Sequence, residues 1–275
     1  MKLKIKKFDI SKMAPDAVVL LVGKRGTGKS TMLKDILYNM RHTLYAGVAM
    51  CPTEDSVEGE NGLSSFIPPS LVHDKYKPEV IRRLLNYQKK FIKANSKEKA
   101  KRMFIVLDDC MYEKNVMKGE EMREVHMNGR HRKLFFINAV QYMMDIPPAL
   151  RTNIDYVFAL KENIIGNRER LWRHLFGMFK DYASFGATMD TLTNGFSAMV
   201  LDNKVRSTNV EDCVFWYEAD ARPKKFRMCN PVYWQLDKEC KKNEDDSESD
   251  SNQGGSTKQV FIQKVQAMEK KKKKR

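Results

Sequence analysis

Continuous apolar runs alternate with helix-spaced apolar positions along most of the chain. The runs that are long enough for strands buried on both faces are Ala17–Val22, Leu44–Met50, Met103–Leu107, Leu134–Val140 and Ile154–Leu160. Runs of this kind are typical of parallel strands covered on both sides. The alternation predicts an α/β fold, with a mainly parallel central sheet flanked by helices on both faces.

The segments between and after these runs complete the predicted architecture. In Pro78–Arg102 the apolar residues Ile81, Leu84, Leu85 and Ile92 share one helix face, and basic residues fill the rest. We expect two more helices, an edge strand and two late strands at Ile165–Lys180, Ala183–Thr193, Leu3–Ile10, Phe196–Leu201 and Val214–Glu218. Turn-forming residues in Pro52–Pro69 predict a surface segment.

The composition changes near residue 240. Glu244–Asp250 is dominated by acidic residues and serine, and Lys270–Arg275 is an unbroken basic run. Segments of this kind bury too little apolar surface to fold. We therefore expect one α/β domain over residues 1–240 and a disordered, acidic-then-basic tail over residues 241–275.

The first apolar run leads into the motif G-x-x-x-x-G-K-[S/T]. Its residues are Gly23, Lys24, Arg25, Gly26, Thr27, Gly28, Lys29 and Ser30. A helical pattern that includes Thr31 follows, so the motif has the strand–loop–helix context that a phosphate-binding loop requires. The loop N–H groups and the helix dipole attract phosphate oxygens. The motif predicts ATP as ligand, with Lys29 at the β- and γ-phosphates and Ser30 on Mg²⁺.

Two acidic residues follow the buried run Met103–Leu107. A phosphate-binding loop needs an acid at the same edge of the sheet to hold Mg²⁺, and Asp108 is placed to supply it. A second acid beside it can activate a water molecule, which is the role we expect for Asp109. Each could instead be a turn or cap residue, but the pair after such a loop favours ATP hydrolysis.

Further candidates follow later in the chain. Gln141 ends the run Leu134–Val140, and it either orients the attacking water or faces solvent. The chain order resembles that of the P-loop proteins in which this strand inserts between the loop strand and the acidic strand. Hydrolytic ATPases gain strongly from an arginine beside the γ-phosphate, which a neighbouring subunit supplies in rings. Arg130, Arg132 and Arg151 are the candidates.

Charge indicates the kind of partner, and cysteine content indicates the redox compartment. The chain of 275 residues has a formal net charge of +15, which indicates an anionic partner, nucleic acid first. Its five cysteines are widely spaced, which disfavours a disulfide framework or a zinc site and fits a reducing compartment. No apolar run approaches the roughly 18 residues of a membrane span.

Four segments carry a resemblance to a known family. They read GKRGTGKS, FIVLDDC, NGRHRKLFFINAVQY and PPALRTNIDYVFAL. The first two are generic, and the last two are much more specific. Together they resemble the DNA-packaging ATPases of nucleocytoplasmic large DNA viruses, the poxvirus type, which belong to the FtsK/HerA class of P-loop NTPases. The resemblance covers residues 1–235.

The resemblance implies a homo-oligomeric ring that threads double-stranded DNA into a preformed capsid, driven by ATP hydrolysis. It implies Lys29, Asp109 and Gln141 as catalytic residues, Ser30 and Asp108 as Mg²⁺ ligands, and Arg130, then Arg151, as the arginine finger. Asp109 stands where related cellular motors commonly carry glutamate. The implied partners are DNA and a capsid or portal protein, at the viral assembly site in the host cytoplasm or in the virion.

Two other classes compete with this interpretation. A nucleoside or nucleotide kinase is also a P-loop enzyme of this size, and Arg168–Arg173 is the segment nearest to its arginine-rich lid. The pair Asp108-Asp109 and Gln141 favour hydrolysis instead. A non-catalytic nucleic-acid-binding module would explain the charge and the basic tail, but not the complete phosphate-binding motif.

Overall fold

The computed structural model describes residues 3–54, 62–112, 115–221 and 225–248. The chain forms two compact units, Met1–Met228 and Cys229–Arg275. Each unit is described by itself.

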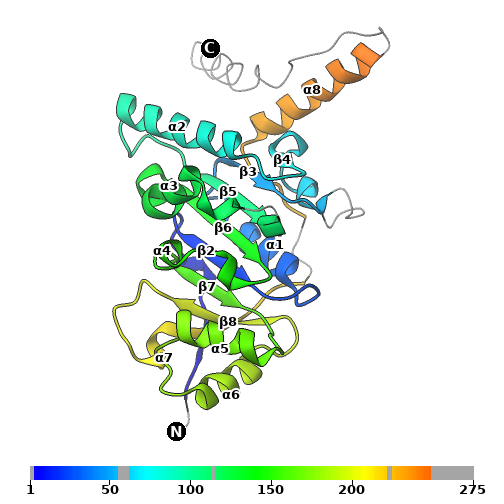
Figure 1. The fold of residues 1–275 in the computed structure, drawn as a ribbon. Coiled ribbons are helices and arrows are strands. Elements are labelled where there is room, and N and C mark those ends of the chain that lie inside the picture. The colour runs from blue at the N-terminus through cyan, green and yellow to red at the C-terminus, as the bar shows by residue number, and fades with distance from the viewer. Residues whose placement is uncertain (1–2, 55–61, 113–114, 222–224, 249–275) are drawn as a thin grey trace. The chain divides into compact units, whose positions relative to one another are not determined.

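The first unit is built on a nine-stranded sheet. The strands are β1 (Lys6–Lys7), β2 (Val18–Val22), β3 (Ala46–Met50), β4 (Val72–His73), β5 (Met103–Asp108), β6 (Leu134–Val140), β7 (Tyr156–Ala159), β8 (Ser197–Asp202) and β9 (Val214–Glu218). Their order is β1-β9-β8-β7-β2-β6-β5-β3-β4, and Figure 1 shows β3, β5, β6, β2, β7 and β8 following one another across the molecule. Every pairing is parallel except those of β8 with β7 and β9. The predicted α/β class and mainly parallel sheet are confirmed.

The central strands are apolar because the sheet is covered on both faces. All residues of β2, β3, β5, β6 and β7 are buried. Phe136 pairs in register with Val18, and Phe158 pairs with Leu21, so the two phenylalanines point to opposite faces. His126 of helix α3 (Glu120–Asn128) packs edge-on against Phe136. On the other face, Tyr217 packs against Phe158, and its hydroxyl donates a hydrogen bond to Asp35 of helix α1 (Lys29–Met40).

The helices join the strands and cover them. They are α1 (Lys29–Met40), α2 (Pro78–Asn95), α3 (Glu120–Asn128), α4 (Pro148–Arg151), α5 (Ile165–His174), α6 (Tyr182–Leu192) and α7 (Val210–Cys213). In α2, Ile81 and Leu85 are buried on the predicted face. The helix predicted over Ile165–Lys180 ends earlier, at His174, because the chain turns there and buries Phe176 and Phe179.

One loop differs from its predicted role. We expected Pro52–Pro69 to lie on the surface, but Leu63, Phe66 and Ile67 are buried. Phe66 stacks on Phe226, at 4.8 Å between ring centroids. The turn-forming residues of this segment therefore did not reveal that the apolar side chains between them pack into the core. Residues 55–61 lie outside the described residues.

The second unit contributes helix α8 (Pro231–Glu248). Proline is well suited to the first turn of a helix, where its missing N–H is not needed. The helix continues through residues 241–248, which we predicted to be disordered. These residues include no proline or glycine, the two residues that oppose a helix most strongly, so a helix that begins at Pro231 can extend through them. The predicted disorder of residues 249–275 lies outside the described residues.

Candidate functional site

The loop after β2 has the geometry of a phosphate-binding loop. It runs from Gly23 into α1, whose N-cap is Gly28. Gly26 and Gly28 have φ angles of +79° and +95°, which side chains other than glycine adopt at a cost in strain. A Cβ atom on Gly23 would lie 2.8 Å from Cβ of Leu160, so the loop can approach the residue that follows β7 this closely only as glycine. The predicted strand–loop–helix context is confirmed.

Lys29 lies inside this loop. Its ammonium donates hydrogen bonds to the carbonyl oxygens of Gly23 and Lys24, at 2.8 and 3.3 Å. Burial lowers the pKa of Lys29, and the negative charges of Asp109 and Asp108 oppose that shift. The ammonium group of Lys29 is therefore held between the loop and the acidic pair, where it would contact the phosphates of a nucleotide.

Asp108 ends β5 on the same side of the sheet as the loop, and it is buried. Burial, followed by the charge of Asp109, raises its pKa to about 6, and Lys29 opposes that shift. A buried carboxylate with a raised pKa is an environment that a divalent cation would stabilise. Ser30, which is exposed in the first turn of α1, would supply a second oxygen. These residues fit Mg²⁺, which takes one or two protein oxygens together with phosphate and water.

Asp109 turns away from the strand direction, with a φ angle of +55°. Its carboxylate accepts a 2.7 Å hydrogen bond from Nε2 of Gln141. The bond is possible because β6 lies between β2 and β5, so the ends of the three strands are adjacent. The predicted insertion of this strand is confirmed. Lys29, Asp108, Asp109 and Gln141 meet at one edge, which we call the carboxyl edge of the sheet.

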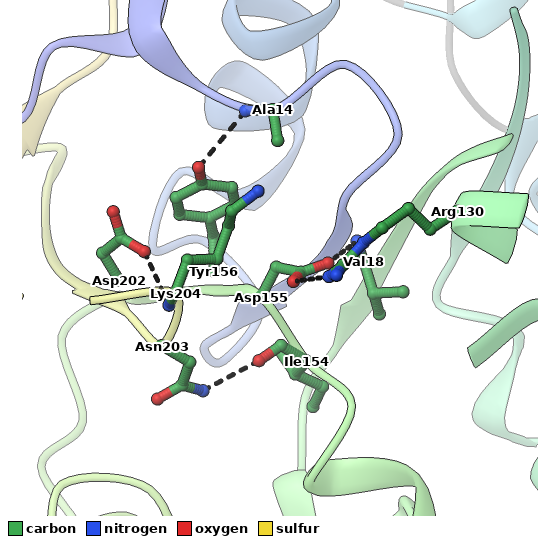
Figure 2. Close-up of polar contacts among 9 residues, drawn as sticks. All are labelled: Ala14, Val18, Arg130, Ile154, Asp155, Tyr156, Asp202, Asn203 and Lys204. Atoms are coloured by element: carbon green, nitrogen blue, oxygen red, sulfur yellow. Dashed lines mark hydrogen bonds and ion pairs between the residues drawn. The ribbon is translucent and has the colours of Figure 1, made fainter. Parts of the chain in front are cut away.

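Arg130 lies at the opposite edge, which we call the amino edge, where β2 and β7 begin. Its guanidinium donates to Asp155 at 2.7 Å, and Asp155 also accepts the N–H of Val18 (Figure 2). The pair lines a cavity of about 400 Å³ that also includes Asn203 and Lys204. The Arg130 side chain is 58% exposed. The five residues of β2 separate the two edges by roughly 15 Å.

Arg151, the second candidate finger, is buried within its own chain. The residue is 7% exposed, and its Nη1 lies 3.6 Å from the sulfur atoms of Met143 and Met144. Burial lowers its pKa. Within the described part of the chain, its Nε has no hydrogen-bond partner. Arg132, the remaining candidate, pairs with Glu124 at 3.2 Å.

Two acidic residues at the carboxyl edge were not predicted. Glu162, after β7, binds Lys24 of the phosphate-binding loop at 3.2 Å and is itself buried. Glu54, after β3, accepts the N–H groups of Leu63 and Ser64, and its charge contributes to the raised pKa of Asp108. No motif marks either residue: Glu162 is separated from the run Ile154–Leu160 by Lys161, and Glu54 lies among turn-forming residues.

The remaining loop residues differ in exposure. Arg25 is exposed, whereas Thr27 and Thr31 are partly buried. The Thr27 hydroxyl donates to the carbonyl oxygen of Lys24 at 2.7 Å, which helps to close the loop. Over the described residues, no helix is long and apolar enough to cross a membrane.

The fold and this edge define a P-loop nucleoside triphosphatase. Two solved structures share the fold: the DNA-packaging ATPase B204 from Sulfolobus turreted icosahedral virus, and the genome packaging NTPase B204 from Sulfolobus turreted icosahedral virus 2 in complex with ATP-gammaS. The first has a TM-score of 0.55 at 14% identity, over 76% of this chain and 100% of that chain. The second has a TM-score of 0.53 at 17% identity, over 75% of this chain and 99% of that chain.

The chain belongs to the family described as Poxvirus A32 protein, whose sequence model matches residues 5–215. An uncharacterized protein of Acanthamoeba polyphaga mimivirus, L437, is 31% identical over 82% of this chain and 80% of its own length. An uncharacterized protein of Invertebrate iridescent virus 6, 075L, is 31% identical over 76% of this chain and 80% of its own length. The resemblance to the poxvirus-type family is confirmed.

Proposed function

We propose that the protein hydrolyses ATP to drive double-stranded viral DNA into a preformed capsid during virion assembly. The observation that carries the hydrolytic part is the hydrogen bond between Gln141 and Asp109, beside Lys29 and Asp108 at one edge. A carboxylate and an amide held together can take a proton from a water molecule and orient it. Membership of the poxvirus family and the fold shared with B204 support the packaging role.

Each residue of the edge has a separate role in this proposal. Lys29 neutralises the β- and γ-phosphates, and the loop N–H groups bind their oxygens. Ser30 and Asp108 would hold Mg²⁺, which would offset the negative charge that develops on the phosphates. Asp109 accepts the proton of the attacking water, and Gln141 holds that water in line. Asp109 remains the base although its side chain is one methylene shorter than glutamate, because Gln141 holds its carboxylate in place.

Arg130 acts on the neighbouring subunit in this proposal. It cannot reach the phosphate site of its own chain, because β2 separates the two edges by roughly 15 Å. To act as a finger, the Arg130 guanidinium must leave Asp155, and because the side chain is 58% exposed, solvent weakens that ion pair. It can then reach the carboxyl edge of a second copy in a ring, where an arginine finger lowers the barrier to hydrolysis. Exposure favours Arg130 over the enclosed Arg151.

The partners in this proposal are DNA, further copies of the chain, and a capsid or portal protein. The net charge of +15 supports a polyanionic partner. DNA packaging places the protein at the viral assembly site in the host cytoplasm, and it can remain associated with the virion. Residues 1–240 are the ATPase domain, and residues 241–275 are an accessory tail.

A kinase is the second candidate, and one contact disfavours it. Arg168, in the segment nearest to a kinase lid, is held by helix α6, where it bonds to the carbonyl oxygen of Gly186 and to Asp190 at 2.8 and 3.0 Å. A lid arginine must be able to close over the phosphates. A non-catalytic DNA-binding module would leave the geometry of Asp109 and Gln141 without a role.

One experiment separates the three candidates. We would measure phosphate release by purified protein with and without double-stranded DNA, and then with thymidine and nucleoside monophosphates as acceptors. The proposal predicts release to water that DNA stimulates, and its loss in Lys29→Ala. Transfer to an added acceptor would identify a kinase, and an absence of turnover would leave a binding module.

A further inference from the structure

Three exposed apolar side chains lie next to the phosphate-binding loop. Ile164, Ile165 and Phe196 are 50%, 65% and 53% exposed. Ile164 and Ile165 begin α5 just after β7, and Phe196 directly precedes β8. Single exposed apolar residues need no explanation, but three of them from two segments at one edge do.

Phe196 lies directly against the loop. A Cβ atom built on Gly28 would lie 2.8 Å from Cδ1 of Phe196, so the ring covers the backbone at the start of α1. The antiparallel register of β7 and β8 pairs Ala159 with Met199, so the start of β8, which Phe196 directly precedes, lies beside the end of β7. The ring therefore stands where β7 and the phosphate-binding loop meet.

Glu162 connects the segment that carries Ile164 and Ile165 to the phosphate-binding loop. Its carboxylate accepts the N–H of Ile164 at 2.8 Å and an N–H of the Asn167 amide at 3.1 Å, while it binds Lys24 of the loop at 3.2 Å. One buried carboxylate thus holds the first turn of α5 against the phosphate-binding loop.

The strand order decides which end of a nucleotide would meet these side chains. Asp108, Asp109 and Gln141 follow β5 and β6, which lie on one side of β2, and they mark the γ-phosphate end. The strands β7 and β8 lie on the other side of β2. A nucleotide held along the loop with its γ-phosphate at the acidic pair must direct its base toward β7 and β8.

We propose that Phe196, with Ile164 and Ile165, binds the base of the nucleotide. The base stacks on the exposed Phe196 ring, and the isoleucines make apolar contacts beside it. This inference rests on the proposed nucleotide site at Lys29, and it adds the part of that site that recognises the nucleoside. Stacking of a base on an aromatic ring is strong enough to be measured by substitution.

The test compares a ligand that has a base with one that lacks it. We would measure the Kd of Mg·ATP and of inorganic tripolyphosphate by calorimetry for the wild type, Phe196→Ala and Phe196→Trp. We expect Phe196→Ala to weaken Mg·ATP binding by about tenfold or more, the scale of one lost stack, and to leave tripolyphosphate binding unchanged. Phe196→Trp should restore ATP binding.

Met127→Ala is the matched control, because Met127 is also exposed, at 45%, but lines the cavity at the amino edge. It should leave both ligands unaffected. Equal losses of ATP and tripolyphosphate in Phe196→Ala would show that the ring only supports the loop, and no loss would exclude contact with the base. A lower mass of Phe196→Ala in light scattering at saturating tripolyphosphate would show an interface between copies. Each of these results overturns the inference.

Failure of the proposed function gives a different pattern. Lys29→Ala should weaken tripolyphosphate binding, because it removes the cation inside the loop. If Lys29→Ala binds tripolyphosphate as well as the wild type does, the phosphate site itself is misplaced, whatever Phe196→Ala does. If tripolyphosphate requires Lys29 and Phe196→Ala leaves Mg·ATP unchanged, only the base site is wrong.

Discussion

Two adjacent aspartates acquire different environments from one turn of the backbone. Asp108 is the last residue of β5 and is buried, whereas Asp109 has a φ angle of +55° and turns toward Gln141. Burial raises the pKa of Asp108 to about 6. One carboxylate is therefore suited to a metal ion, and the other is accessible to water. The division of roles between them is a property of single residues, and substitution can test it.

Asparagine at each position separates these roles. Asparagine tolerates the left-handed backbone of Asp109, so Asp109→Asn should fold and bind Mg·ATP. Its turnover should fall by at least about a hundredfold, the scale of a lost general base. Asp108→Asn should instead weaken Mg²⁺ dependence and nucleotide binding. Steady-state kinetics across Mg²⁺ concentrations measure both, and the reverse pattern would exchange the two assignments.

The Gln141 amide offers a second test at this scale. Gln141→Ala should lower kcat by about a hundredfold, the scale of one positioned hydrogen-bond donor, with little change in KM. Gln141→Glu should be at least as severe, because it places a like charge against Asp109. Single-turnover rates for the two variants and the wild type provide the measurement. Near-normal turnover in Gln141→Glu would remove Gln141 from the proposed mechanism.

The sequence predicted some residues of the site and could not predict others, for a physical reason. Lys29 and Asp108 belong to short motifs, since a phosphate loop and its acid need fixed residues next to fixed elements. Glu162 and Phe196 reach the loop only through the pairing of β2 with β7 and of β7 with β8. Contacts between residues so distant in the chain leave no spacing that a sequence pattern could reveal.

At the scale of elements, helix α1 is hydrogen-bonded to β9, which lies three strands away from β2 in the sheet. The Tyr217 hydroxyl of β9 donates to Asp35 of α1, and the Asn39 amide and the N–H of Asp220 also bond to Asp35. Burial raises the pKa of Asp35. The helix that begins at the phosphate-binding loop is thus held at its middle by a buried polar group.

This bond predicts a dependence of stability on pH. The folded-state pKa of Asp35 lies above its unfolded value, so the cost of ionising Asp35 is absent at low pH and appears as pH rises through the folded pKa. Asp35→Asn carries no such charge. Its free energy of unfolding, relative to the wild type, should therefore increase between pH 4 and pH 7 in urea titrations. A difference that is constant, or that decreases with pH, would contradict this account.

The short 3-10 helix η8 (Gly129–Arg132) carries the proposed finger, and mixing of variants can test it. Arg130→Ala should bind ATP yet hydrolyse it on the order of 10³-fold more slowly, as other arginine fingers do. Mixing it with Lys29→Ala should restore part of the activity, because one variant keeps the loop and the other keeps the arginine. Arg132→Ala, from the same turn, is the control and should stay active. If the mixture of Arg130→Ala with Lys29→Ala stays inactive, and a mixture of Arg151→Ala with Lys29→Ala regains activity, the finger is Arg151.

The sequence predicted those strands whose run of apolar residues follows from burial on both faces. The five apolar runs became β2, β3, β5, β6 and β7, with ends shifted by at most a few residues. The direction of β8 could not be predicted, because a strand's own residues do not report whether its neighbour is parallel or antiparallel. The buried part of Pro52–Pro69 was missed for a related reason: Phe66 packs against Phe226, a partner 160 residues away.

At the scale of the whole molecule, charge is unevenly shared between body and tail. Residues 241–275 contain ten basic and six acidic residues, so +11 of the net charge of +15 lies in residues 1–240. A ring that passes DNA of every sequence must hold it through phosphate contacts. Such contacts release counterions, so the affinity for DNA should fall linearly with salt on logarithmic axes.

The most direct test of the central claim is the ATPase rate as a function of double-stranded DNA concentration, measured at two salt levels. A packaging ATPase should show stimulation that does not depend on DNA sequence and that weakens at the higher salt level. It also predicts that a chain ending at residue 240 is stimulated, with modestly lower affinity for DNA, and that Lys29→Ala is inactive throughout. If truncation erases the stimulation, the tail binds the DNA and the ring does not. If the full-length protein is not stimulated at low salt, the proposed packaging function is wrong.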